Sequence, residues 1–210
     1  MPKSIRILLL ALAASCTAHA QNMPSVAGCD IRRGTLCTSL NLNGASLEGV
    51  NLMNSQFTRS TLVDARLQKA NLSEANFSST DLRNADLREA AMVRINLRSA
   101  RLNGANLSGA NLSNAVLQNA DLTGADLSDA ILTGADFTNA RLNGAKMNKV
   151  DLQRANLRAA HLKGASLVGA NLQGANFTRA SLIDVDLTGA KLEGAIFLSA
   201  QTTGCIGCPD

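Results

Sequence analysis

The most reactive spacing in the sequence lies near its end, where Cys205 and Cys208 form a C-x-x-C run. This spacing is found in thiol redox motifs and in zinc sites. A redox motif places its thiolate at the N-terminus of a helix, and no helical pattern follows Cys208. A four-cysteine zinc site would need a second pair, and Cys29 and Cys37 lie near the other end of the chain. A structural disulfide is favoured, with a thiol-redox protein acting through Cys205 and Cys208 as the alternative.

The rest of the sequence contains few residues that could support catalysis. Beyond residue 20 there is one histidine, His161, and its local sequence offers no second histidine, free cysteine or carboxylate as a partner. Nucleophile elbows, phosphate loops and metal-ligand spacings are absent from the sequence. We therefore expect His161 to face solvent. We assign no catalytic, cofactor-binding or metal-binding residue and predict that the protein is not an enzyme.

The N-terminal segment has the features of an export signal. Lys3 and Arg6 flank the start of an apolar run, 5–14, that is too short to span a bilayer as a helix. The sequence Ala-His-Ala at 18–20 is the small-x-small pattern of signal-peptide cleavage. Residues 1–20 are predicted to be removed, which leaves no transmembrane segment and predicts a periplasmic or secreted protein.

Cys16 offers an alternative to cleavage after Ala20. The run Ala-Ser-Cys at 14–16 could place Cys16 at a lipidation site, although Ala13 stands where such sites usually have Leu. In either case the loss of Lys3 and Arg6 leaves 18 Lys and Arg against 16 Asp and Glu, so the exported chain carries a charge of only +2. This balance predicts no nucleic-acid partner.

A five-residue period organises almost all of the remaining sequence. From Leu42 to Phe197 every fifth residue is Leu, Phe or Met, in 32 positions without an exception. Ala lies two residues before this central position in 24 of the 32 units, and 12 of the 16 glycines lie two residues after it. A helix would spread a period of five around its whole circumference, whereas Ala-Asn-Leu alternates inward and outward as a short strand does. Glycine supplies the backbone freedom for a corner, so the pattern predicts a solenoid.

Two further observations set the length of one coil at 20 residues. The five phenylalanines are separated by multiples of 20. Residues one coil apart should stack about 4.8 Å apart, where opposite charges attract. The sequence has eight oppositely charged pairs at this spacing and no like-charged pair: Arg66/Asp86, Lys69/Glu89, Glu74/Arg94, Asp81/Arg101, Arg101/Asp121, Asp121/Arg141, Asp126/Lys146 and Asp129/Lys149.

These residues resemble the pentapeptide-repeat family, whose consensus is A(D/N)Lxx. The resemblance covers residues 40–199 and implies a right-handed quadrilateral β-helix of about eight coils, with the central residue and the preceding Ala facing inward. The expected organisation is a signal peptide at 1–20, an N-terminal cap at 21–39, the β-helix at 40–199 and a C-terminal cap at 200–210.

The four cysteines beyond residue 20 all lie in the expected caps. Eight coils place the two ends roughly 38 Å apart, far beyond the reach of a disulfide. The expected pairs are therefore Cys29–Cys37 and Cys205–Cys208, and export would favour both bonds.

Function is less constrained than fold. The favoured hypothesis is an exported, non-enzymatic structural or interaction module that presents flat faces to a protein or envelope partner. The resemblance also suggests a DNA mimic that binds DNA gyrase, but such a role needs a strongly acidic rod in the cytoplasm. This chain is nearly neutral and carries an export signal.

Three apolar residues near the end depart from the polar outward pattern: Ile183, Ile196 and Leu198. Exposed apolar residues often mark an association site, and in resembling proteins the C-terminal end commonly forms a dimer contact. Two interpretations are open: the segment holding Cys205 and Cys208 folds back over these residues, or they form a homodimer surface.

Two expectations concern the core. Met92 and Ile95 should widen one coil without breaking the register. The phenylalanines should share one internal stack.

Overall fold

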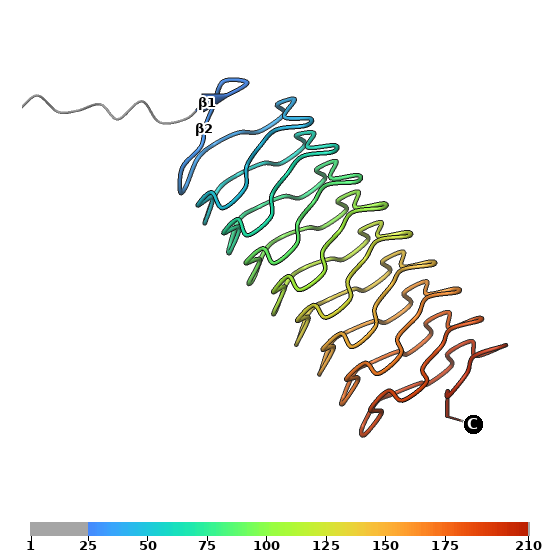
Figure 1. Cartoon of the computed structure of the whole chain (residues 1–210). Coiled ribbons are helices and arrows are strands. Elements are labelled where there is room, and N and C mark those ends of the chain that lie inside the picture. Colours follow the sequence, from blue (N-terminus) through green and yellow to red (C-terminus); the bar gives the residue numbers. More distant parts are fainter. Residues whose placement is uncertain (1–24, 210) are drawn as a thin grey trace, which may run out of the picture.

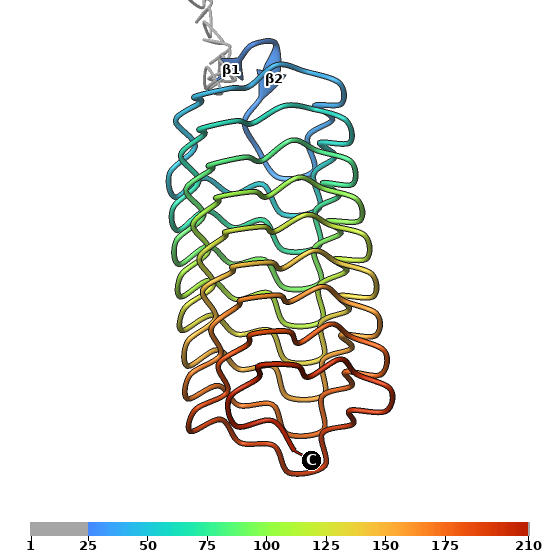
Figure 2. The same cartoon turned by 90° about the vertical axis from the view of Figure 1, so that its right-hand side faces the viewer.

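The computed structural model describes residues 25–209 and shows a stack of similar coils (Figure 1). The predicted signal peptide, including Cys16, lies outside the described residues. Two short strands form an antiparallel hairpin at the N-terminal end of the stack: β1 (Ser25–Val26) and β2 (Cys29–Asp30). The C-terminal residues lie at the opposite end (Figures 1 and 2).

Each coil takes 20 residues, as the charge pattern predicts. Parallel bridges join residue i to residue i+20 from Leu36↔Gln56 to Asp186↔Ile206. The fold is a right-handed quadrilateral β-helix with four sides. We number the sides by their central residues, which recur every 20 positions: side 1 from Leu42 to Leu182, side 2 from Leu47 to Leu187, side 3 from Leu52 to Leu192, and side 4 from Phe57 to Phe197.

Central residues fill the interior. Each one from Leu42 to Leu187 is at most 2 % exposed, and its amide donates a hydrogen bond to the carbonyl 19 residues ahead, in the next coil. The aromatic rings share side 4 but form two separate pairs, with centroids 4.6 Å apart for Phe57 and Phe77 and 5.0 Å for Phe177 and Phe197. Phe137 has leucines on both sides, so the expected single aromatic stack is interrupted.

The corners follow one rule whatever residue occupies them. All 32 residues two places after a central position have a positive φ, between 53° and 71°, and 20 of these residues are not glycine. The amide three places after the central residue donates to the central carbonyl, as Ala45 does to Leu42 at 3.1 Å. A turn with positive φ at its third residue alone is of type II. The corner is therefore imposed by the winding of the chain, and glycine only lowers its cost.

The turn hydrogen bond varies slightly in length with the residue at the inward position. Where Ala occupies it, the turn hydrogen bond measures 2.8–3.1 Å. The bond is longer at Val150, 3.4 Å, and at Val185, 3.3 Å, and it measures 3.2 Å at Ser55, Thr80 and Ile95. The register nevertheless continues through Met92 and Ile95, which are both fully buried. The prediction that the register continues without a break is confirmed, and the widening of this coil stays a prediction.

The preference for Asn or Asp before the central residue has a direct structural cause. In all 17 units that carry Asn or Asp there, the side-chain Oδ1 accepts a hydrogen bond from the amide two residues later, at 2.9–3.4 Å. This is an Asx-turn. It satisfies an amide at the start of the corner, which the ladder between coils leaves without a partner.

The two ends of the stack differ. At the N-terminal end Cys29, Ile31 and Cys37 are buried and join the core, so the first coil is covered. Cys29 and Cys37 form a disulfide with Cα atoms 5.3 Å apart. At the C-terminal end Leu192 and Phe197 are only half-buried. The fold therefore has one covered end and one partly open end.

Candidate functional site

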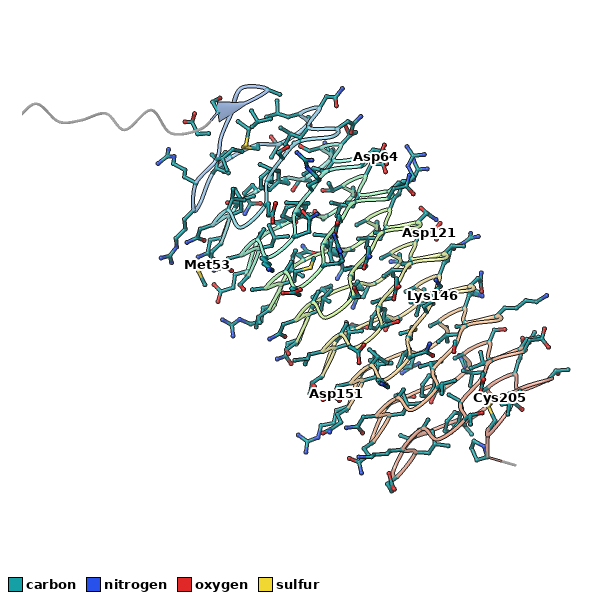
Figure 3. All side chains as sticks on the ribbon, viewed as in Figure 1. Met53, Asp64, Asp121, Lys146, Asp151 and Cys205 are labelled. Carbon is teal, nitrogen blue, oxygen red and sulfur yellow. A yellow bond between two sulfur atoms is a disulfide. The ribbon has the colours of Figure 1, made fainter. Side chains whose placement is uncertain are left out.

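Charged residues concentrate on two adjacent sides. At the strand positions that flank the central residues of the eight coils, sides 1 and 2 carry 13 charged residues, whereas sides 3 and 4 carry six. In Figure 3, Asp64, Asp121 and Lys146 lie along one edge of the stack, and Met53 and Asp151 lie along the opposite edge. The rod therefore has a charged half and a mostly uncharged half.

Four of the eight expected cross-coil pairs form ion pairs: Lys69–Glu89 at 3.9 Å, Arg101–Asp81 at 3.4 Å, Arg141–Asp121 at 3.8 Å, and Arg94–Glu74. The other four are not within ion-pair distance. Arg66, for example, donates to Ser46 instead of pairing with Asp86. Charged residues therefore do pair between coils, but residues within one coil compete for the same partners.

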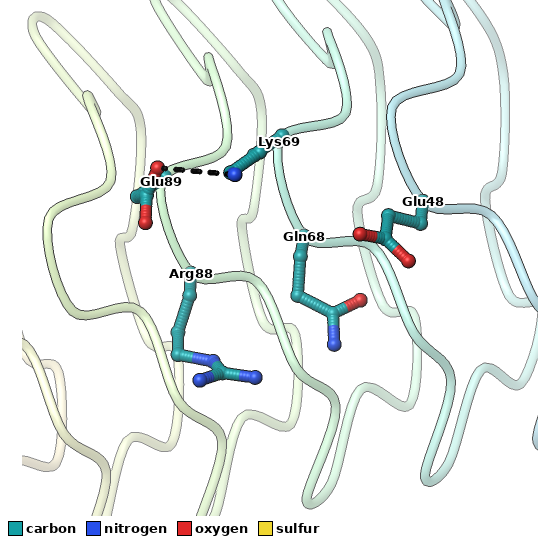
Figure 4. A pocket seen from close by; sticks show the side chains of 5 residues that line it. All are labelled: Glu48, Gln68, Lys69, Arg88 and Glu89. Carbon is teal, nitrogen blue, oxygen red and sulfur yellow. Dashed lines mark ion pairs between the residues drawn. The ribbon is translucent and has the colours of Figure 1, made fainter.

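Asp86 shows this competition. Its two side-chain partners, Gln68 and Arg88, line the hollow of Figure 4 together with Glu48, Lys69 and Glu89. Arg88 donates from Nε and Nη2 to the two oxygens of Asp86 at 2.8 and 2.6 Å, and Gln68 Nε2 donates to the same carboxylate at 2.6 Å. The hydrogen bonds from Arg88 lower the pKa of Asp86 despite its partial burial. The lining of this hollow contains both positive and negative side chains, so their charges balance one another.

A second hollow, of about 320 Å³, lies where sides 4 and 1 meet, and it is lined by Asn139, Arg141, Asn143 and His161. The structure places His161 on the surface, bridged to Arg141 one coil earlier, as expected. Sequence reasoning missed the hollow, because Asn139 and Asn143 join it only through the folding of two sides.

The C-terminal segment covers only half of its end. Leu182 and Leu187 donate to the carbonyls of Gln201 and Ile206, which begin a ninth coil, and both leucines are at most 2 % exposed. Gly207 then occupies the next central place, and Cys205 is bonded to Cys208 with Cα atoms 5.8 Å apart. The segment therefore covers sides 1 and 2 and leaves sides 3 and 4 open.

The open half contains two of the three apolar residues singled out by sequence. Ile196 is 48 % exposed and Leu198 is 68 % exposed, whereas Ile183, on side 1, is half-buried. The interpretation in which the tail folds back over Ile196 and Leu198 is wrong, because that segment continues along sides 1 and 2. Beside them, within residues 25–209, the amides of Leu192 and Phe197 have no backbone partner.

Neither a membrane helix nor a metal cluster is found in this part of the chain. Between residues 25 and 209 no helix is long and apolar enough to cross a membrane. Over the same range, no three His, Cys, Asp or Glu side chains gather as a metal site would require.

Comparison with known proteins agrees with this geometry. A family model described as pentapeptide repeats (8 copies) matches residues 95–134, 120–158, 135–174 and 160–197, and a second model, pentapeptide repeat region, matches 35–112. HetL, a protein involved in heterocyst differentiation regulation from the cyanobacterium Nostoc sp. strain PCC 7120, is 33 % identical over 82 % of this chain and 89 % of its own (TM-score 0.35). The chain belongs to the pentapeptide repeat family.

Other solved pentapeptide repeat structures are also similar. A trypsin-treated variant of QnrB1, a plasmid-mediated fluoroquinolone resistance protein, has a TM-score of 0.66 at 19 % identity, over 79 % of this chain and 91 % of that chain. A pentapeptide repeat protein from the Arabidopsis thaliana thylakoid lumen is 37 % identical over 54 % of this chain and 68 % of its own, with a TM-score of 0.19. No protein of curated function matches the chain by sequence. Pentapeptide repeat proteins are generally structural or interaction proteins.

Proposed function

We propose that this pentapeptide repeat protein is an exported, non-enzymatic interaction module that forms a homodimer through the open half of its C-terminal end. The observation that carries the proposal is the combination of apolar and polar groups at that end. Ile196 and Leu198 are exposed beside half-buried Leu192 and Phe197. Such a surface favours contact with another protein, because apolar area is removed from water when it is covered.

The unpaired backbone groups at this end also favour a second copy of the chain as the partner. Among residues 25–209, the amides of Leu192 and Phe197 and the carbonyls of Ala190, Ala195 and Ala200 lack backbone partners. An open strand edge recruits another strand. A second copy brings the same donors and acceptors, so it satisfies both sets of groups around a twofold axis.

Light scattering on the purified protein tests the dimer. We expect a dimer for the unaltered chain and a monomer for the Ile196→Ser/Leu198→Ser double variant. Ile131→Ser is the matched control, because Ile131 is also exposed, at 43 %, but lies on side 3 in the middle of the stack. A monomer for the unaltered chain, or a dimer that survives the double variant, would refute this interface.

The uncharged half of the rod is the proposed surface for the protein or envelope partner. On side 3, the ten strand positions flanking the central residues from Asn51 to Thr133 carry no charged residue. Cross-linking from introduced cysteines at Ser113 and Thr133 on this side, inside exporting cells, would capture that partner. The matched control is a cysteine at Ser128 on side 2. Equal capture from both sides would contradict a preference for the uncharged half.

Export is part of the proposal and has its own test. The small-x-small sequence at 18–20 supports cleavage before Gln21. The mature protein recovered from the periplasm or medium should begin at Gln21. A product that retains residues 1–20 in the cytoplasm would overturn export, and a lipid on Cys16 would support anchoring instead.

Binding to DNA gyrase, as in some members of the family, is the alternative. A DNA mimic relies on a strongly negative surface, and this chain has 20 Lys and Arg against 16 Asp and Glu. We expect no protection of gyrase in a supercoiling assay. Protection at stoichiometric protein would favour the alternative role.

A further inference from the structure

One ladder on side 1 alternates in charge and then stops. Asp81, Arg101, Asp121 and Arg141 follow one another at successive coils. Arg101 pairs with Asp81 at 3.4 Å, and Arg141 Nε lies 3.8 Å from Asp121 Oδ2. The next place in the alternation would hold an anion, but His161 occupies it. The ladder therefore ends on a cationic residue with no carboxylate above it.

The hollow of about 320 Å³ lies at this break, and its lining offers hydrogen-bond donors. The Oδ1 atom of Asn143 already accepts a hydrogen bond from the amide of Lys163 at 3.0 Å, so the Nδ2 group is what Asn143 has left to offer. The ion pair of Arg141 with Asp121 involves Nε, so the two Nη groups of this side chain, which is 62 % exposed, are what Arg141 offers to a ligand. Arg141, Asn143 and His161 can therefore all donate to one ligand.

The surroundings of the hollow are also basic. No carboxylate is among its four lining residues, Asn139, Arg141, Asn143 and His161. Asp121, one coil away, is already engaged: its Oδ1 accepts from the amide and the hydroxyl of Thr123 at 3.1 and 2.6 Å. Lys163 lies beside His161 on the same side and adds a further positive charge.

We propose that this hollow binds an oxyanion, a carboxylate or a phosphate, between Arg141 and His161. A guanidinium fork matches both groups geometrically and forms charge-assisted hydrogen bonds with them. The bound anion supplies the negative charge that the ladder lacks at this place. The site is separate from the proposed dimer interface, and it holds whether or not that interface forms.

Proton NMR can test the site directly, because the chain has only two histidines, His19 and His161. The C2–H resonance of His161 is assigned with a His161→Asn variant. Sodium phosphate and sodium acetate are then titrated in separate samples at constant pH and ionic strength, with sodium chloride as the reference. We expect one or both anions to shift the His161 resonance saturably, beyond the shift seen with chloride.

Variants decide whether the ligand binds at this place. Arg141→Gln should weaken the saturable binding by about tenfold or more, as expected for loss of a charge-assisted hydrogen bond. Arg66→Gln, which alters an exposed arginine on side 2 several coils away, is the matched control and should leave the binding unchanged. Unchanged circular dichroism for both variants would show that they fold.

Each result of the titration has a defined meaning. Saturation with phosphate alone assigns a phosphate ligand, and saturation with acetate alone assigns a carboxylate. Neither anion exceeding chloride would overturn the proposal. Equal binding by the unaltered chain and Arg141→Gln would also overturn it, because the ligand would then be held elsewhere.

Discussion

Replacing Phe137 with Ala tests the inward assignment of the central residues. The ring is completely buried and lies between the coils of Leu117 and Leu157. Its own coil is fixed by a hydrogen bond from the Phe137 amide to the Asn156 carbonyl at 2.7 Å. Because this ladder resists collapse, the lost ring should leave a cavity. We expect a loss of about 3–5 kcal/mol in the free energy of unfolding.

Urea unfolding followed by far-ultraviolet circular dichroism, with the disulfides intact, measures this loss. Phe197→Ala is the matched control, because Phe197 stacks on one ring only, Phe177 at 5.0 Å, and is half-buried at the open end. It should cost about 1–2 kcal/mol. Since repeat proteins can unfold in parts, the slope of the transition must match between variants. A loss below about 1 kcal/mol for Phe137→Ala would show that the ring is not enclosed.

Three further perturbations have defined outcomes. Ala159→Gly should stabilise the fold by about 1 kcal/mol in the same assay, because Ala159 has a φ of 53° that glycine adopts without strain; no gain would mean that the corner is relaxed. The pKa of Asp86 is lowered by Arg88, so this carboxylate stabilises the fold above its ordinary pKa of about 3.9 and loses that effect as the pH falls through its lower folded value. The difference in melting temperature between the unaltered chain and Arg88→Gln should therefore shrink between about pH 5 and pH 2, and a constant difference would contradict the pairing. Cys205→Ser/Cys208→Ser should speed hydrogen exchange at the amides that pair with residues 201–206, and unchanged exchange would show that the segment is held without its disulfide.

The coil was predictable because its determinants repeat. A period of five with stacked charges at a spacing of 20 defines a four-sided coil, and the bridges from Leu36 to Ile206 follow it. The corner geometry was only partly predictable. Glycine marks 12 corners, yet residues such as Arg59 and Ala159 adopt the same positive φ. The winding of neighbouring coils, which a single unit does not encode, imposes that conformation.

The ends and surface features depend on geometry outside the repeat. Cys205 marks a cap in the sequence, but the half of the end that it covers depends on where Gly207 falls relative to Leu187. The charge pairs between coils are predictable from spacing alone, whereas the hydrogen bond from Arg66 to Ser46 depends on side-chain conformation. A hollow such as that at His161 arises where two sides meet, so no local sequence pattern predicts it.

In each Asx-turn, one side-chain atom stabilises the backbone corner and the other is left on the surface. Each Asn or Asp before a central residue commits Oδ1 to the corner, so the atom left over is an amide donor in Asn and a negatively charged acceptor in Asp. An exchange between these two residues therefore reverses the hydrogen-bonding character of one point on the surface while the backbone keeps the same bond. Asn156 and Asp136 already show this one coil apart: Asp136 Oδ2 accepts from Gln118 Nε2 at 2.5 Å, whereas Asn156 Nδ2 donates to Thr138 Oγ1 at 2.9 Å. A lineage can thus rewrite the outside of this rod, one atom at a time, for new partners without altering its coils.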